Sequence, residues 1–195
     1  MRALFRQLKP ALLATVVFTL ICGVAYPLLS TAVGQVAFGD KADGSLIRRN
    51  GVVVGSKLLG QSFIAPKYFH PRPSAAGTGY DGSASSGSNL GPLSPDLLAA
   101  VEERVAAYRA ENGLGVTAMV PVDAVTASAS GLDPHISIAN ARLQIGRVAT
   151  ARGVDAAVVA HLVQQYTEGR QLLVLGEPGV NVVELNLALD DLSAG

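Results

Sequence analysis

The strongest constraint in this sequence is an apolar run near its start. No charged residue occurs from Pro10 to Gly39, and residues 11–29 are almost wholly hydrophobic. About 20 helical residues cross a hydrocarbon core of roughly 30 Å. Signal-peptide apolar regions are shorter, at about 7 to 15 residues. We therefore predict a retained transmembrane helix at residues 10–36, with cleavage at the small residues Ser30–Ala32 as the alternative.

Basic residues precede this run. Arg2, Arg6 and Lys9 all lie within the first nine residues. Positively charged flanks of a first membrane helix stay in the cytoplasm. We therefore expect residues 1–9 to be a basic cytoplasmic N-terminus and residues 37–195 to form one extracytoplasmic domain. In a bacterium this predicts a single-pass protein of the inner (plasma) membrane, in contact with the lipid bilayer.

Small and weakly polar side chains within the predicted span suggest a surface for packing against neighbouring membrane helices. The residues of this surface are Thr15, Thr19, Gly23 and Ala25. The single cysteine, Cys22, excludes an internal disulfide framework and a cysteine-based zinc site.

The rest of the chain is typical of a mixed α+β domain. Asn50-Gly51 between two strand-like runs indicates a β-hairpin. A stretch rich in Gly, Ser and Pro follows at about residues 60–94. Loops of this length are usually functional or disordered, and the interspersed aromatic residues favour an ordered loop laid over the domain.

Helix signals follow this loop. Ser94-Pro95 starts a helix that ends near Gly113 and buries a stripe of apolar residues. Two more helices are expected, one at residues 138–152 and one that begins at Asp155. The buried stripe of the first helix comprises Leu97, Leu98, Val101, Val105 and Tyr108. Alternating apolar residues near the end of the chain predict a half-buried strand. These residues are Val183, Leu185, Leu187 and Leu189.

Composition and motifs exclude several functions. Once the three basic residues of the N-terminus are set aside, 12 basic residues remain against 15 acidic ones, which argues against a nucleic-acid binder. The sequence has no phosphate-binding loop, no G-x-S-x-G and no H-E-x-x-H. We predict no catalytic residue and no metal site. His70 is expected to support the long loop, and His161 to be a structural residue of its helix.

The stretch "VTASASGLDPHIS", Val125 to Ser137, is the densest group of polar residues. Ser128, Asp133 and His135 suggest a hydrolase, but catalytic groups usually meet only in the fold rather than in the sequence. We expect a tight loop that satisfies its own backbone groups and serves as a docking surface. Ser137 is expected to cap the next helix, and the side chain of His135 to cap or orient it.

Four stretches, in order, carry a resemblance: "GQSFIAPKYFHPRPSA", "SASSGSNLGP", "VPVDAVTASASGLDPHIS" and "LLVLGEPGVNVVELNLALD". With the apolar N-terminal segment, they resemble the C subunit of the Kdp-type potassium-transporting P-type ATPase over nearly the whole chain. One departure is visible, because that family usually has glycine where this chain has Ala129. The alanine suggests that this position does not require a positive φ.

The resemblance implies a membrane complex that imports potassium at the expense of ATP. The partners would be a potassium-channel-like subunit and an ATP-hydrolysing P-type subunit, which handle potassium and ATP, so this chain itself needs no cofactor. The family is described as a catalytic chaperone that raises the ATP affinity of the hydrolysing subunit. The residues that would form the interface are Ser86, Asn89, Ser128, Ser130, Asp133 and His135.

The resemblance also implies a nucleotide contact near Gln144, with Arg147 beside it. The predicted topology opposes this contact, because Gln144 would lie outside the membrane and ATP inside. Two other functions stay open: a membrane-anchored periplasmic sensor or ligand-binding domain, and an anchored hydrolase.

Overall fold

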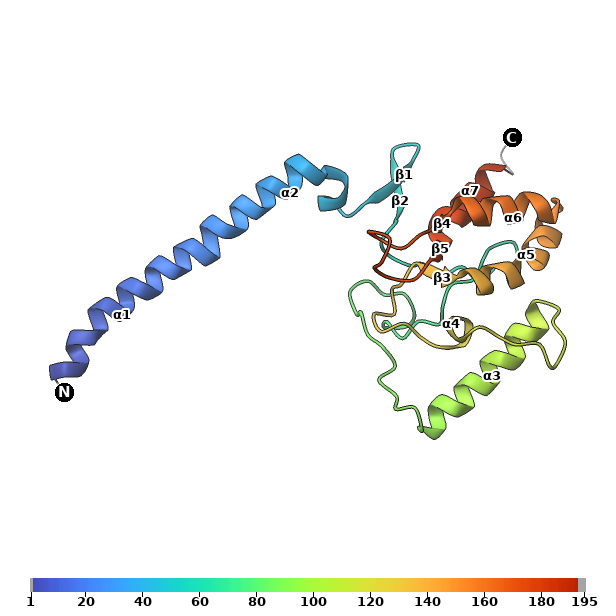
Figure 1. The fold of residues 1–195 in the computed structure, drawn as a ribbon, viewed down its shortest axis with the longest axis horizontal. Helices are drawn as coiled ribbons and strands as arrows, with labels where there is room; N and C mark the ends of the chain where they lie inside the picture. The colour runs from blue at the N-terminus through green and yellow to red at the C-terminus, as the bar shows by residue number, and fades with distance from the viewer. Residues whose placement is uncertain (1, 193–195) are drawn as a thin grey trace. The chain divides into compact units, whose positions relative to one another are not determined.

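The computed structural model describes residues 2–192, with side chains from residue 6 onward (Figure 1). The chain folds as two compact units, which divide between residues 46 and 47. The first unit is mainly helical and the second is mixed α/β.

The first unit consists of α1 (Arg2–Leu20), a π-helical turn (Ile21–Ala25) and α2 (Tyr26–Ala42). The π-helical turn has a physical cause in Pro27. Proline lacks an N–H and its ring collides with the carbonyl four residues earlier, which is that of Gly23 inside the turn. Within residues 2–192, the segment Arg6–Ala42 is the one helix long and apolar enough to cross a membrane, and an 18-residue stretch within it has a mean hydropathy of 2.2. The helical structure thus continues six residues past the predicted end at residue 36.

The predicted hairpin begins at the boundary of the two units, with β1 (Leu46–Arg49) paired with β2 (Val52–Ser56). Asn50 and Gly51 both have positive φ, at 50° and 79°, as this turn requires. The hairpin is confirmed.

A three-stranded antiparallel sheet lies beside the helices, in the order β3 (His135–Ser137), β5 (Gly179–Asn181), β4 (Thr167–Glu168). The helices of the second unit are α3 (Pro95–Glu111), α4 (Val122–Val125), α5 (Ile138–Arg152), α6 (Ala156–Gln165) and α7 (Val182–Leu192). The hydrophobic core forms between α5, α6, α7 and the sheet. Its fully buried members include Phe69, Ile136, Val148, Val159, Leu185 and Leu189.

The predicted helices of this unit are confirmed in position, although Ser94 makes no side-chain cap hydrogen bond at the start of α3. The Ser137 hydroxyl accepts a hydrogen bond from the backbone N–H of Asn140 at 3.1 Å, which caps α5 as predicted, and Gly153 ends α5 with φ 65°. Asp155 caps α6 in the same way. The apolar stripe expected on α3 is confirmed in part, because Tyr108 is buried while Leu98 is 57% exposed. The other three members, Leu97, Val101 and Val105, are half-buried.

The strand predicted near the end of the chain is wrong, because residues 182–192 form α7. Buried residues recur at 182, 185, 186 and 189, which is a helical spacing that the alternation of apolar residues concealed. The Asn181 side chain caps the helix by accepting from the backbone N–H groups of Val183 and Glu184, both at 3.1 Å. His161 also differs from expectation, since it is exposed on the surface of α6.

The long loop is ordered, as predicted. Between β2 and α3 the chain runs over the helices and the sheet, and its Phe69 and Ala76 are fully buried. This segment supplies most of the candidate site.

Candidate functional site

The candidate site is the surface where the long loop meets residues 126–135. We call this surface the loop layer. The Ser74 hydroxyl donates to the Gly131 carbonyl at 2.6 Å, and the Ser86 N–H donates to the Ser130 carbonyl at 3.0 Å. The Gly60 N–H donates to the Leu132 carbonyl at 2.8 Å. Two segments far apart in the sequence are thereby held together by backbone groups and by the Ser74 hydroxyl.

Gly131 is the tightest point of the loop layer. Its φ is 68°, and a Cβ atom there would lie 2.7 Å from both the Ala76 nitrogen and the Ser86 carbonyl oxygen. A side chain is therefore excluded by backbone atoms as well as by conformation. Ala129 is not among the residues with positive φ, which agrees with the interpretation that this position tolerates a side chain.

Asp133 holds the end of the loop layer. Its carboxylate accepts from the His135 N–H at 2.9 Å and from the Arg72 guanidinium at 3.1 Å. Burial alone would raise the pKa of Asp133, but the hydrogen bonds from the His135 side chain and backbone, and the charge of Arg72, lower it below its usual value. Asp133 is therefore a carboxylate that fixes shape at neutral pH.

The ring of His135 lies between two carboxylates. Its Nδ1 is 3.6 Å from Asp133 and its Nε2 is 3.3 Å from Glu168. The interaction with Asp133 raises the pKa of His135, assisted by Glu168 and opposed by burial. A hydrolase triad would require one ring nitrogen to face the Ser128 hydroxyl. Both ring nitrogens of His135 face acidic groups instead.

The start of α5 is held by a residue that sequence reasoning missed. The Asp123 carboxylate accepts from the Ser137 N–H at 2.8 Å, the Ser137 hydroxyl at 2.7 Å and the Asn140 side chain at 2.9 Å. The helix-orienting role predicted for the His135 side chain is wrong, because its ring nitrogens face Asp133 and Glu168. Asp123 lies 14 residues before Ser137, and no local sequence signal links the two.

Two buried amides attach the long loop to the helices. Asn186 of α7 accepts from the Phe69 N–H at 2.8 Å and donates to the Phe69 carbonyl at 2.9 Å. Gln144 of α5 does the same for the next residue, with distances of 2.7 Å and 3.1 Å to the His70 N–H and carbonyl. The polar Asn186 within the apolar run "VELNLAL" was the signal that sequence reasoning overlooked.

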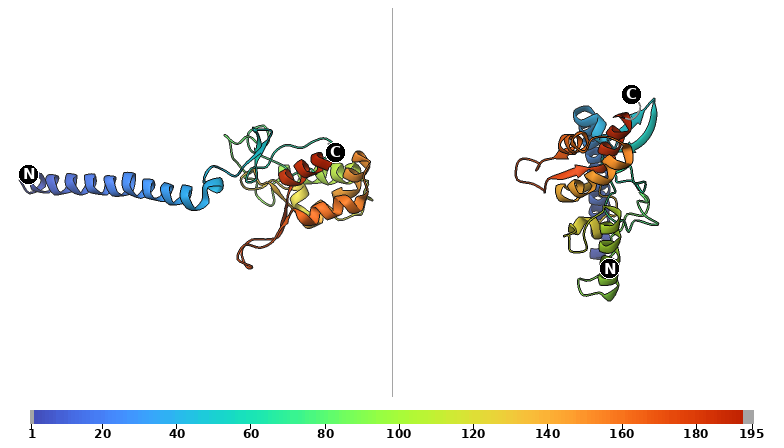
Figure 2. Two further views of the ribbon diagram at one scale, coloured as in Figure 1. Left: turned by 90° about the horizontal axis from the view of Figure 1, so that it is seen from above. Right: turned by 90° about the vertical axis from the view of Figure 1, so that its right-hand side faces the viewer.

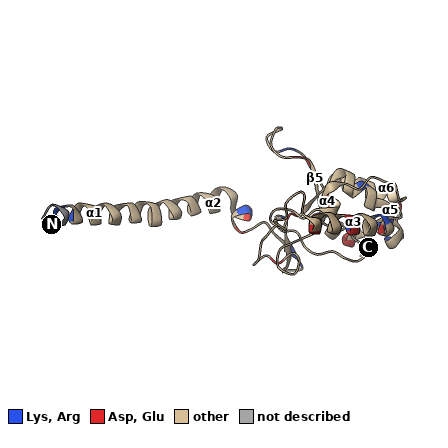
Figure 3. Cartoon of the chain, turned by 90° about the horizontal axis from the view of Figure 1, so that it is seen from below, with Lys and Arg blue, Asp and Glu red and all other residues tan. Residues whose placement is uncertain are grey.

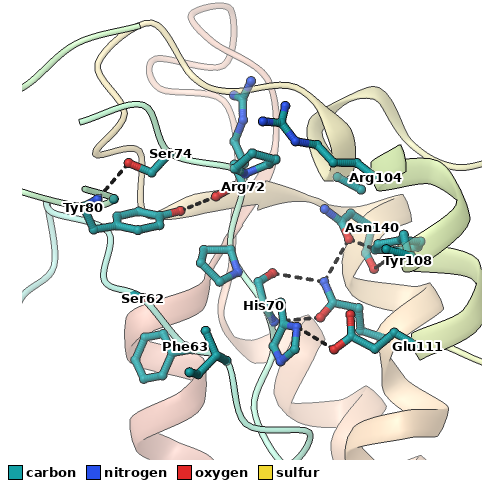
Figure 4. Close-up of a pocket in the computed structure, with 17 residues that line it drawn as sticks. Ser62, Phe63, His70, Arg72, Ser74, Tyr80, Arg104, Tyr108, Glu111 and Asn140 are labelled. Carbon is teal, nitrogen blue, oxygen red and sulfur yellow. Dashed lines mark hydrogen bonds and ion pairs between the residues drawn. The ribbon is translucent and has the colours of Figure 1, made fainter. Parts of the chain in front are cut away.

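A pocket of about 350 Å³ opens between the long loop, α3 and α5 (Figure 4). Gln144 lies on its wall, together with His70, Tyr108 and Glu111. The His70 ring is 2.9 Å from Glu111 and 3.1 Å from the Ala65 carbonyl, so it supports the loop as predicted. Burial, and then the charge of Arg147, lower the pKa of His70.

Gln144 and Arg147 are already engaged within the protein. Besides His70, the Gln144 amide donates to Asn140 at 2.8 Å and accepts from Arg147 at 2.6 Å, which fills its two donor and two acceptor positions. Arg147 also donates to the Pro66 and Tyr68 carbonyls, at 2.6 and 2.9 Å. These contacts assign both side chains a role in holding the loop, and nucleotide contact stays a prediction.

The interface residues predicted from the sequence are partly brought together. Ser86, Ser128, Ser130, Asp133 and His135 lie in or beside the loop layer, with Ser128 buried and Ser130 exposed. Asn89 lies three residues beyond Ser86, exposed and with φ 52°. Among the described residues, no group of three or more His, Cys, Asp and Glu side chains is arranged to hold a metal ion.

Comparison with known proteins identifies the family. The family described as "KdpC: K+-transporting ATPase, c chain" matches residues 8–191. A protein of Mycobacterium bovis named "Potassium-transporting ATPase KdpC subunit" is 59% identical to this chain, over 96% of this chain and 99% of its own length. A protein of the same name from Methylococcus capsulatus is 56% identical, over 97% of this chain and 100% of its own length. The chain belongs to the KdpC family. The resemblance drawn from the four stretches is confirmed, and the KdpC match includes both the apolar helix and the loop layer.

Proposed function

We propose that this chain is a non-catalytic accessory subunit of an ATP-driven potassium-import complex. It is held in a bacterial inner membrane by its N-terminal helix, and its second unit docks, outside the cytoplasm, on the subunits that conduct potassium and hydrolyse ATP. The names of its relatives support the complex, since each is called a subunit of a potassium-transporting ATPase.

The observation that carries the accessory role is that Asp133, Arg72 and His135 of the loop layer bind one another or nearby backbone and carboxylate groups. Among the described residues, Arg72 Nε and His135 Nε2 are the side-chain atoms buried there without a hydrogen bond. Asp133 binds Arg72 and a backbone N–H, and both nitrogens of the His135 ring face carboxylates. Groups used in this way fix the shape of a surface instead of reacting with a substrate. A rigid, polar surface of this kind suits docking.

The membrane anchor is supported by the charge pattern of the first unit. Figure 3 shows Lys, Arg, Asp and Glu only near the two ends of the α1 and α2 segment. The basic end precedes the apolar run, which favours a cytoplasmic N-terminus. The second unit would then lie outside, separated from ATP by the membrane.

This topology bears on the chaperone role. We propose that the subunit raises the ATP affinity of the hydrolysing subunit indirectly, by stabilising the assembled complex. Direct contact of Gln144 and Arg147 with nucleotide is the competing proposal, and it requires the inverse topology.

Cysteine labelling tests the topology. In a Cys22→Ala background, a cysteine replacing Gln165, which is exposed on α6 outside the predicted interface, is expected to react with an impermeant thiol reagent when only the outer membrane is permeable. If labelling requires rupture of the inner membrane, the second unit lies in the cytoplasm, and direct nucleotide contact is favoured.

Assembly and growth test the function. The full chain is expected to co-purify with two multi-span proteins and to restore growth at low potassium to a strain that lacks its own copy. A membrane-anchored sensor or ligand-binding domain would bind its own ligand without such partners. Purification without any transporter subunit would refute the accessory role.

A further inference from the structure

The loop between β4 and β5, residues 169–178, carries an apolar tip. Leu172, Leu173, Val174 and Leu175 are 82%, 89%, 72% and 56% exposed. Figure 2 shows the loop extending away from the body formed by α5, α6 and α7. Single exposed apolar residues are normal on a protein surface, but four in succession at the end of a projection mark an interaction site.

Contacts join the two arms of the loop. At its base, the Arg170 guanidinium donates to both carboxylate oxygens of Glu177 at 2.8 Å. Further out, Gln171 and Leu175 exchange two backbone hydrogen bonds, each of 2.8 Å. The apolar tip is therefore presented on a short paired ribbon, so little ordering is needed when it binds.

The turn at the tip places leucine where other residues fit better. The Val174 N–H bonds to the Gln171 carbonyl at 3.2 Å, and the two central residues, Leu172 and Leu173, have φ values of 50° and 68°. A hairpin turn with positive φ at both centres favours Asn-Gly, as the chain itself uses at Asn50-Gly51. Two leucines in this conformation strain the backbone, which points to a function for their side chains.

The charges around the tip favour a protein partner over a lipid surface. Residues 169–178 contain one basic and one acidic side chain, Arg170 and Glu177, which pair with each other. Segments that bind anionic lipid carry clusters of Lys and Arg, and Trp or Tyr commonly mark the membrane interface. This loop has neither. A neutral ribbon ending in aliphatic side chains matches an apolar pocket on a protein.

We propose that the apolar tip, residues 172–175, inserts into an apolar socket on the extracytoplasmic face of another subunit of the same transporter. This inference rests on the proposed function, because it takes its partner from the complex. It adds a contact that the loop layer does not contain: the loop layer supplies a polar surface, and the tip supplies an aliphatic anchor.

The double substitution Leu172→Asn with Leu173→Gly separates docking from folding. Asn and Gly favour the backbone conformation of this turn, so the unfolding midpoint of the full chain is expected to stay the same or to rise. The apolar side chains are lost, so the affinity of the full chain for the other subunits, titrated in detergent, is expected to fall at least tenfold.

A matched control uses apolar residues exposed elsewhere. Val116 and Met119, between α3 and α4, are 85% and 90% exposed, and replacing both with Asn is expected to leave the affinity unchanged. Wild-type affinity in the tip variant would overturn the inference, as would an equal loss in the control. Failure of the wild-type chain to bind any transporter subunit would instead overturn the proposed function.

Photo-cross-linking identifies the occupant directly. With p-benzoylphenylalanine replacing Leu173 in the membrane-embedded complex, an adduct with another subunit is expected. An adduct with lipid alone would overturn the proposed protein socket. This measurement keeps the inference testable even if the double substitution disturbs the fold.

Discussion

Replacing Gln144 with alanine distinguishes a structural amide from a nucleotide contact. The side chain is 1% exposed and binds the N–H and carbonyl of His70. In the Gln144→Ala variant both groups of His70 lose their partner. Each unsatisfied group costs about 1 to 3 kcal/mol when it is shielded from water, so we expect the free energy of unfolding to fall by about 2 to 6 kcal/mol.

The loss would be large for a protein of ordinary stability. The free energy of unfolding of a domain is about 5 to 15 kcal/mol, so a decrease of this size clearly lowers the unfolding midpoint. Urea or thermal unfolding of the full chain in detergent measures it. Complex yield and potassium-dependent ATPase activity are expected to decrease together with stability, because the loop that Gln144 holds belongs to the docking surface.

A control on the same protein calibrates the measurement. Gln165 is exposed at the end of α6, and Gln165→Ala is expected to change the unfolding free energy by no more than about 0.5 kcal/mol. The structural reasoning would be refuted if Gln144→Ala unfolded and assembled normally while the apparent ATP affinity of the complex fell tenfold, about 1.4 kcal/mol.

Three further predictions concern His135, Gly131 and Gly23. The pKa of His135 is raised above its model-peptide value of 6.5, so its protonated form stabilises the fold. The loss of stability in His135→Gln should therefore be largest below pH 6.5 and should shrink as the pH rises through the raised pKa. Unfolding at several pH values measures this. Gly131→Ala should destabilise the chain by more than about 1 kcal/mol and lower complex yield, whereas Gly91→Ala, which meets no atom within 4 Å, should do neither. Gly23→Leu should leave unfolding unchanged, because its Cβ would meet only Thr19 at 3.8 Å, but should reduce co-purification if this face packs on a partner helix.

The elements that the sequence predicted correctly are those whose signals are local. Ser137 and Asp155 begin α5 and α6, Gly153 ends α5, and Asn50-Gly51 turns the hairpin. Each of these residues acts on backbone groups within a few positions of itself, so its neighbours in the sequence suffice to predict its effect.

The end of the chain was predicted wrongly because two periodicities overlap there. Val183, Leu185, Leu187 and Leu189 alternate as on a strand, yet Val182, Leu185 and Leu189 also follow a helical spacing. Glu, Leu and Ala favour helices, and Asn181 supplies the cap. The prediction followed the alternation, although the helical spacing, the helix-favouring residues and the cap together favour α7.

The contacts that build the candidate site were not predictable, because they are long-range. Gln144 binds a residue 74 positions away, and Asn186 one that is 117 positions away. A buried amide in a helix does not reveal from the sequence which backbone it will meet. The sequence therefore indicated a docking surface around Asp133, and only the fold showed what holds the long loop in place.

The two proposed contacts are linked by one side chain. His135 of β3 lies between Asp133, which ends the loop layer, and Glu168, which ends β4 just before the loop that carries the apolar tip. When the ring is protonated, it attracts both carboxylates, and the tip and the loop layer are held in a fixed relation. When it loses its proton, that attraction is lost, although β3 and β4 still pair with β5. A partner that binds both surfaces at once would therefore bind best below the raised pKa of His135, and Glu168→Gln should weaken that pH dependence without removing either surface.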